Sequence, residues 1–420
     1  MKTRFRVCGA LRLLSGLVTG LVCGVLPGLG QVILAPPPAI SITPPAVEQA
    51  QTNNPMVVFT PEEAPETPFR WEWFTFRPHA LYRFLYATAL PVTVTDRVRT
   101  TVQEIAPGLL VNVGQHWSVD YTPTLRFYSS RAFEDTLDHS VRLMAGTTYQ
   151  DWTLGLLQTY DKTSQPLVET GTQTDQETFY TRLSASYQIN SQMSADGAVS
   201  QRIVSADVFQ SSKEWSPSTW LNYQFWPRFD AGLGLAGGYV DVETGSDMSY
   251  ERFQVRANWR ATDKLALRAH AGAEWRQFLD SDADDELNPV AGAQVQYQPF
   301  EHTRLSLGVN RTVDVSLLTA GAGESQVIEM TEVTAQLSQR LLEHFQLELG
   351  GGYFRGEYTA ADPTVPDRKD DFFRFNARLG WRFLRRGTVA LFYQYTDLRS
   401  NFAAYGFSGH QTGFELEFRY

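Results

Sequence analysis

The sequence has almost no cysteine, and none after residue 23. Cys8 and Cys23 are the only two, so the chain beyond them has no thiol for a disulfide or a thiolate metal site. A chain of this kind tolerates an oxidising compartment but makes no use of it. An excess of positive charge is also missing, since the net charge is -10. This balance argues against a nucleic-acid-binding protein, which would show a basic stripe.

Long apolar runs are missing as well once the first 30 residues are passed. No later stretch approaches the roughly 20 apolar residues that a membrane-spanning helix needs. If the mature chain spans a membrane, it must therefore do so as a closed β-barrel, the other structure that satisfies every backbone polar group in lipid.

Residues 1–30 are typical of a secretory signal peptide. Basic residues at positions 2, 4 and 6 precede an apolar stretch over 13–25, and Gly28 and Gly30 are small residues of the kind found at cleavage sites. The alternatives are a retained membrane anchor and a lipoprotein modified at Cys23. Pro27 ends the apolar run too early for the first, and Val22 stands where the second needs a small residue.

Residues 31–77 form a proline-rich segment with few core-forming side chains. Such a composition predicts an extended, mostly disordered segment, which we expect to lie in the periplasm. It could be a passive spacer or an arm that binds a partner.

From residue 78 to residue 420, apolar and polar side chains alternate within segments of ten to fourteen residues. Examples are the stretches 265–275 and 373–383, in which every second residue is aliphatic or aromatic. This period of two is the strand signal. A β-propeller or β-helix is the soluble alternative. The polar side chains lie on one face of nearly every strand, however, so a barrel would have an apolar exterior that is stable only in lipid.

The connectors between these segments alternate between two classes. Eight short turns, such as those near 114–115 and 384–386, take turns with nine long polar loops, such as 161–176 and 312–326. Short turns in the periplasm and long extracellular loops are typical of outer-membrane barrels. The count predicts an all-β, antiparallel, up-and-down transmembrane barrel of about 18 strands, with 16 as the alternative.

The last segment ends on an aromatic residue and alternates without a break. It resembles the terminal β-signal that the barrel-assembly machinery recognises in bacterial outer-membrane proteins. The resemblance assigns the recognised outer face to Phe414, Leu416, Phe418 and Tyr420. The simpler interpretation is that any closing strand needs an apolar outer face.

In its alternation of strand segments, short turns and long loops, and in its last strand, the region 70–420 resembles the β-barrel porin families of Gram-negative bacteria. Some of these families are associated with exopolysaccharide production. The resemblance implies a channel in the cell outer membrane that passes small solutes or an anionic polymer such as an exopolysaccharide. It also implies lipid, lipopolysaccharide and the barrel-assembly machinery as partners, with an exopolysaccharide export system as a further candidate. No internal motif is diagnostic of one family.

Arginine outnumbers carboxylates on the polar face of the strands, and its planar, permanently charged group suits carboxylate and phosphate ligands. The residues that we expect to determine selectivity in the lumen are Arg252, Arg256, Arg260, Arg268, Arg276, Arg374, Arg378 and Arg382. In this respect the chain resembles the alginate-export porin, an eighteen-strand barrel with an arginine-rich pore. The alternative is that these arginines pair with Glu across strands and only fill the lumen.

Catalytic and metal sites are not expected, and neither is a cofactor. The closest candidate pair, His270 and Glu274, lies four residues apart on one predicted strand, which separates the two by roughly 13 Å. The acidic stretches 280–286 and 362–371 lack the ordered loop of a calcium site, so we interpret them as solvated loops. The alternatives to a channel are a non-conducting structural or adhesion barrel and, more remotely, an outer-membrane hydrolase.

Overall fold

The computed structural model describes residues 69–93, 95–166, 173–207, 210–279, 284–316, 327–342, 344–358 and 367–419. The predicted signal peptide, nearly all of the proline-rich segment and Tyr420 lie outside the described residues. No helix in the described part of the chain is long and apolar enough to cross a membrane.

All regular elements of the described residues are strands. The first ten are β1 (Arg70–Trp71), β2 (Phe74–Pro91), β3 (Arg97–Val113), β4 (Trp117–Tyr128), β5 (Thr136–Tyr149), β6 (Trp152–Thr163), β7 (Gln176–Gln188), β8 (Met193–Ala206), β9 (Ser212–Trp226) and β10 (Phe229–Val242). The others are β11 (Met248–Thr262), β12 (Leu265–Phe278), β13 (Glu286–Phe300), β14 (Thr303–Val315), β15 (Val327–Leu341), β16 (Phe345–Tyr358), β17 (Arg368–Arg382), β18 (Gly387–Ser400) and β19 (Phe407–Arg419).

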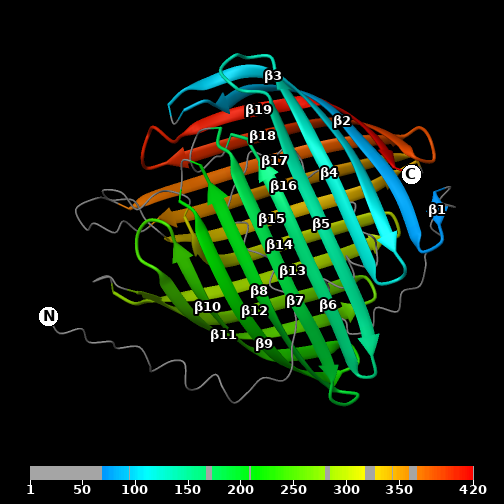
Figure 1. Cartoon of the computed structure of the whole chain (residues 1–420), viewed down its shortest axis with the longest axis vertical. Coiled ribbons are helices and arrows are strands. Elements are labelled where there is room, and N and C mark those ends of the chain that lie inside the picture. Colours follow the sequence, from blue (N-terminus) through cyan, green and yellow to red (C-terminus); the bar gives the residue numbers. More distant parts are fainter. Residues whose placement is uncertain are drawn as a thin grey trace.

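Each strand from β2 to β19 pairs antiparallel with the next one, and β19 pairs back onto β2. The sheet therefore closes into an up-and-down barrel of eighteen strands, which confirms the predicted fold and excludes the sixteen-strand alternative. Figure 1 shows the strands of the front wall, β4 to β9, crossing those of the back wall at a steep angle. This crossing follows from the tilt that barrel closure imposes on every strand.

The start of the barrel differs from the prediction. β2 begins at Phe74 and not at residue 78, and the two-residue β1 pairs with its first residues. The strand signal is weak there because Arg77, Pro78 and His79 interrupt the apolar pattern. The eight short turns lie where they were expected, but the strands run further into the predicted loops. The loop after β2, for example, spans only residues 92–96.

The apolar side chains of alternating positions point away from the lumen. Leu233 and Leu235 on β10 are 55% and 58% exposed, and Phe253 on β11 is 52% exposed. In water this exterior would be unstable, but in an outer membrane it faces lipid. Neighbouring strands bring their outer aromatic rings together, as in the Tyr160–Phe179 pair with centroids 4.5 Å apart. The exterior therefore provides an apolar surface for a bilayer, while polar side chains are left for the lumen.

Candidate functional site: the barrel lumen

The first feature of the lumen is a continuous row of alternating charges on the inner face of eight neighbouring strands, β16 to β19 and β2 to β5. Each strand contributes one residue except β18, which the side chains of β17 and β19 span. Its members, in order round the barrel, are Glu348, Arg378, Glu415, Arg83, Glu104, Arg126 and Asp138. Arg83 lies 2.7 Å from Glu415 and 2.9 Å from Glu104. All three are at most 3% exposed. We call this row the charge ladder; each buried charge in it has an opposite charge beside it, which is the condition for burying charge at all.

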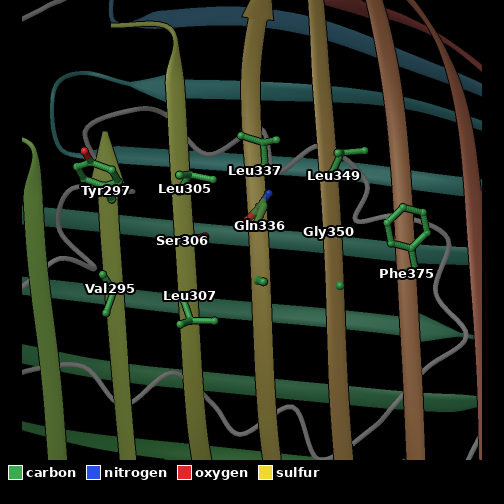
Figure 2. A pocket seen from close by; sticks show the side chains of 12 residues that line it. Val295, Tyr297, Leu305, Ser306, Leu307, Gln336, Leu337, Leu349, Gly350 and Phe375 are labelled. Carbon is green, nitrogen blue, oxygen red and sulfur yellow. The ribbon is translucent and has the colours of Figure 1, made fainter. Parts of the chain in front are cut away.

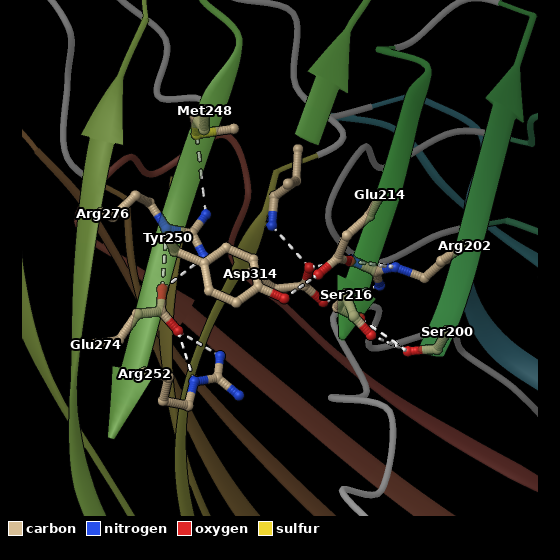
Figure 3. Close-up of polar contacts among 11 residues, drawn as sticks. Ser200, Arg202, Glu214, Ser216, Met248, Tyr250, Arg252, Glu274, Arg276 and Asp314 are labelled. Atoms are coloured by element: carbon tan, nitrogen blue, oxygen red, sulfur yellow. Dashed lines mark hydrogen bonds and ion pairs between the residues drawn. The ribbon is translucent and has the colours of Figure 1, made fainter. Parts of the chain in front are cut away.

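A second polar group lies on the inner face of β8, β9, β11 and β12 and is drawn in Figure 3. Arg252 and Arg276 both bind Glu274, the second at 2.7 Å. Tyr250 donates a hydrogen bond of 2.6 Å to Glu214. Closer to the short turns, Arg256 binds Asp196 at 2.7 Å and lies over the ring of Trp220.

One ion pair of this group crosses the lumen. Arg202 on β8 binds both Glu214 on the neighbouring β9 and Asp314 on β14, as Figure 3 shows. β8 and β14 are six strands apart in the sheet. At about 4.8 Å per strand, six steps along the wall span roughly 29 Å. A direct contact between Arg202 and Asp314 is therefore possible only through the interior of the barrel.

The β14–β15 hairpin makes this contact because the end of β14 separates from β13 while β15 stays paired with β16. β13 begins at Glu286, but it pairs with β14 only from Ala291, which lies opposite Arg311. The remainder of the hairpin, residues 312–315 and 327–330, stays paired with itself, and residues 328–330 of β15 also stay paired with β16. Side chains from both faces of this part are buried, including Val313 at 6% and Ile328 at 4% exposed. A strand of the wall would show one face to lipid, so we infer that the hairpin end lies inside the barrel.

Two apolar clusters cover the hairpin end. One contains Val240, Val242, Met248, Tyr250, Val313 and Val327, which come from β10, β11, β14 and β15. The other joins Ile328 and Met330 to side chains of β2, β3 and β16 to β19, such as Leu85, Phe372 and Phe392. Both lie towards the long loops. The hairpin end and the clusters therefore narrow the lumen in its long-loop half.

At the opposite end, four inward arginines on strands between β11 and β15 lie within four residues of a short turn and make no ion pair within the described part of the chain. They are Arg260 on β11, Arg268 on β12, Arg304 on β14 and Arg340 on β15, and we call them the basic mouth. The register places Arg268 opposite Gln294 and Arg304 opposite Ser338. The directly opposite side chains are therefore uncharged, and the inward carboxylates close by, Asp230 and Glu348, are bound to Asn258 and to Arg378.

The arginines predicted to determine selectivity thus fall into different environments. Arg252, Arg256, Arg276 and Arg378 are held by carboxylates. Arg374 lies over the ring of Phe354 at 5.4 Å from its centroid. Arg260 and Arg268 belong to the basic mouth, and Arg382 ends β17 at the same rim. The three arginines of β17 are therefore not equivalent, because Arg378 is paired with carboxylates and Arg374 lies over an aromatic ring.

The sequence analysis did not select Arg304 and Arg340 as site residues, and it missed Asp314. Arg304 and Arg340 each stand at the end of a strand next to a short turn. Their position next to a turn could have indicated this role, because a charged residue there has few neighbouring carboxylates to neutralise its charge. Asp314 carried no signal, since its partner Arg202 is 112 residues away in sequence.

The residues of the predicted assembly signal lie on β19. Leu416 and Phe418 are 42% and 41% exposed on the outer face, and Phe414 stacks on Phe84 of β2. Tyr420 lies outside the described residues. Recognition by an assembly machinery remains a prediction.

A groove of about 480 Å³ lies on the outer wall and not in the lumen (Figure 2). Outward side chains of β13 to β17, among them Tyr297, Leu305 and Phe375, surround the small residues Ala335 and Gly351. Its lining is apolar, as expected of a surface that faces lipid acyl chains.

A family model described as "Putative beta-barrel porin 2" matches residues 240–420, which run from β10 to the last strand. No curated protein matches the chain. Solved structures with a similar chain path include OccK3 (OpdO) of Pseudomonas aeruginosa, with 13% identity, a TM-score of 0.44 and coverage of 82% of this chain and 95% of that one. OpdQ of Pseudomonas aeruginosa has 9% identity, a TM-score of 0.46 and coverages of 83% and 98%.

The siderophore receptor PirA of Pseudomonas aeruginosa is also similar, with 8% identity, a TM-score of 0.41 and coverages of 81% and 80%. At such identities these likenesses concern the barrel fold and say nothing about a solute. The predicted resemblance to outer-membrane porins is nevertheless confirmed by the family match together with the closed eighteen-strand sheet. The chain is a porin-like outer-membrane β-barrel whose residues 240–420 match the family "Putative beta-barrel porin 2".

Proposed function

We propose that the protein is an outer-membrane channel that prefers anionic solutes and draws them in at the basic mouth. The observation that carries this proposal is the set of four inward arginines without a carboxylate partner in the described structure, in a chain whose net charge is -10. The buried arginines of the charge ladder, in contrast, are neutralised by carboxylates.

The arrangement suits weak, repeated binding of anions. Arg260 and Arg268 stand on neighbouring strands in diagonal positions, since Arg260 pairs with Ala266 and Arg268 with Asn258. Such positions are about 7 Å apart, so two like charges repel each other unless an anion lies between them. Guanidinium groups at a channel mouth raise the local concentration of anions, and sites that bind weakly release them again.

Solutes of this class include small carboxylates and phosphates as well as acidic polymers such as an exopolysaccharide. A polymer would need the whole length of the lumen. The hairpin end crosses the lumen through Arg202 and Asp314, so passage of a polymer requires that this contact opens. Small anions need only the space beside it.

The test is the reversal potential of single channels in a planar bilayer with a salt gradient. Wild type should prefer anions, most strongly at low salt, where charges interact beyond about 10 Å. Changing Arg260, Arg268, Arg304 and Arg340 to Gln should bring the anion-to-cation permeability ratio close to one. The matched control changes Arg355 and Arg399 to Gln, because these exposed arginines lie on the outer face. An unchanged ratio in the quadruple variant would refute the proposal.

A non-conducting structural barrel is the second candidate, and the covered hairpin end is the observation that favours it. The two candidates differ in one measurement. Ion conductance is measured for wild type and for a variant in which the Arg202–Asp314 contact is broken. If neither conducts ions, the protein is a structural barrel and the proposed channel function is refuted.

A further inference from the structure

We propose that the basic mouth is occupied by the chain's own acidic N-terminal segment, residues 48–66. This segment carries Glu48, Glu62, Glu63 and Glu66, and the chain has no Lys or Arg between Arg12 and Arg70. It is therefore a stretch of pure negative charge in front of the barrel. The inference needs the basic mouth but not conduction, so it is independent of the proposed function.

The first argument is where the segment is attached. β1 pairs with β2 at Phe74 and Thr75, and Phe76 donates a hydrogen bond of 3.0 Å to the carbonyl of Phe69. These residues lie at the short-turn end of β2, the same end as the basic mouth. In an outer membrane this end faces the periplasm. The segment and the mouth are therefore on one side of the membrane.

The second argument is the direction in which the segment leaves the barrel. β3 covers one edge of β2, and β19 covers the other from Arg419 upward. β1 lies on the β19 edge, just below the end of β19. The chain before Phe69 therefore starts on the β19 side of β2. In this direction β15 is four strands beyond β19, whereas β3 to β8 lie in the opposite direction round the barrel.

The third argument is that only this side of the rim is basic. The short turns from β9 to β18 contain Arg228, Lys264, Arg385 and Arg386, against Asp263, Glu301 and, in the sequence, Glu343. The basic mouth adds four more positive charges beside them. The turns between β3 and β8, at 114–116, 150–151 and 189–192, contain no Lys or Arg. An acidic segment is therefore attracted to one half of the rim and not to the other.

The fourth argument is reach. Proline-rich chain extends about 3.1 Å per residue, so Glu62, seven residues before Phe69, reaches roughly 22 Å. Arg340 is on the fifth strand from β2 round the β19 side, about 24 Å along the wall and less across the lumen. Glu48 reaches roughly 65 Å, which includes Arg260 and Arg268. Prolines also lower the entropy that such a segment loses on docking.

The experiment measures disulfide formation between one cysteine in the segment and one in the lumen, with Cys8 and Cys23 replaced by Ser. Pro61→Cys is combined with Ser338→Cys, which lies between Arg304 and Arg340 in the register. The matched control combines Pro61→Cys with Ser184→Cys. Ser184 is also a half-buried inward serine near a short turn, on the fifth strand from β2 in the other direction. All charges are kept in both pairs.

We expect the Ser338→Cys pair to form its disulfide at least about tenfold faster than the Ser184→Cys pair at low salt, because attraction raises the effective concentration. At about 1 M salt, where screening acts within about 3 Å, the ratio should fall close to one. Replacing the four glutamates by Gln should abolish the difference in rate between the two cysteine pairs at any salt concentration. Equal rates for the two pairs, or a ratio that neither salt nor the Gln variant changes, would overturn the inference. If the ratio of disulfide-formation rates behaves as expected but the channel shows no preference for anions, this inference stands and the proposed function is refuted.

Discussion

At the scale of single residues, the lumen separates arginines that hold the barrel together from arginines that can act on a solute. Arg83 in the charge ladder is 2% exposed and bound on both sides by carboxylates. Arg304 and Arg340 face the lumen next to a short turn. Both are exposed, and neither forms an ion pair with a carboxylate in the described structure. The same residue type therefore has two roles, and its neighbours decide which.

The ladder predicts a large loss of stability when one member is removed. Glu415 lies between Arg83 and Arg378, at 2.7 Å and 2.9 Å. Glu415→Gln removes the carboxylate that these two buried arginines share and leaves each with its other partner, Glu104 or Glu348. Breaking a buried ion pair from one side typically costs about 3–5 kcal/mol. Arg399→Ala is the control, since Arg399 is in an exposed pair worth at most about 1 kcal/mol. Urea unfolding followed by gel mobility compares the two, and equal midpoints would contradict a structural role of the ladder.

The last strand allows a separate prediction about assembly. Phe418→Ala combined with deletion of Tyr420 should lower the amount of folded barrel in the outer membrane without lowering synthesis. Phe375→Ala is the matched control, because Phe375 is an outward aromatic residue of similar exposure, 43% against 41%, on β17. If both changes lower assembly equally, Phe418 is an ordinary lipid-facing residue and not part of a recognition signal.

At the scale of elements, the β14–β15 hairpin joins opposite parts of the barrel, because β14 separates from β13 at its end while β15 stays paired with β16. Its contact with β8 depends on Asp314, whereas Glu329 on the same hairpin pairs with Arg311. A few side chains therefore hold the hairpin end across the channel.

Charge reversal at this contact should open the lumen. Asp314→Arg places a positive charge against Arg202, so the hairpin end should be repelled and single-channel conductance should rise. Glu329→Arg, which repels Arg311 within the hairpin, is the control and should leave conductance close to that of wild type. A rise in the control variant, or none in Asp314→Arg, would show that the Arg202–Asp314 contact does not control the width of the lumen.

At the scale of the whole molecule, closure of the sheet determines what the protein is. β19 pairs with β2 over residues 411–419, so neither strand is left as an open edge. Because the closed sheet has no open edge strand, the apolar exterior can lie in lipid.

The closed sheet predicts the behaviour of the isolated protein. In detergent, its circular dichroism should be dominated by strand, and the unboiled chain should run faster on a gel than the boiled one because the closed barrel stays compact. Membrane fractionation should recover it with the outer membrane. A helix-rich spectrum, or recovery in the soluble periplasmic fraction, would contradict the fold in its native setting.

The sequence by itself determined the strands, the turns and the two faces of the wall. These features are local: a period of two assigns each side chain to one face, and a short turn can join only neighbouring antiparallel strands. Stretches such as 265–275 and 373–383 were therefore predicted correctly. The start at Phe74 was missed because a strand with arginine, proline and histidine in succession does not alternate visibly.

Only the tertiary structure decided which charges meet. Arg83 and Glu415 are 332 residues apart in sequence, and closure of the sheet makes them neighbours. Arg202 and Asp314 meet because the end of β14 separates from β13, which no local pattern encodes. Alternation assigns a side chain to the lumen but not to a partner, because the partner depends on strand register, tilt and closure of the whole sheet. For this reason the sequence predicted an arginine-rich lumen, and only the folded barrel separated its paired arginines from those of the basic mouth.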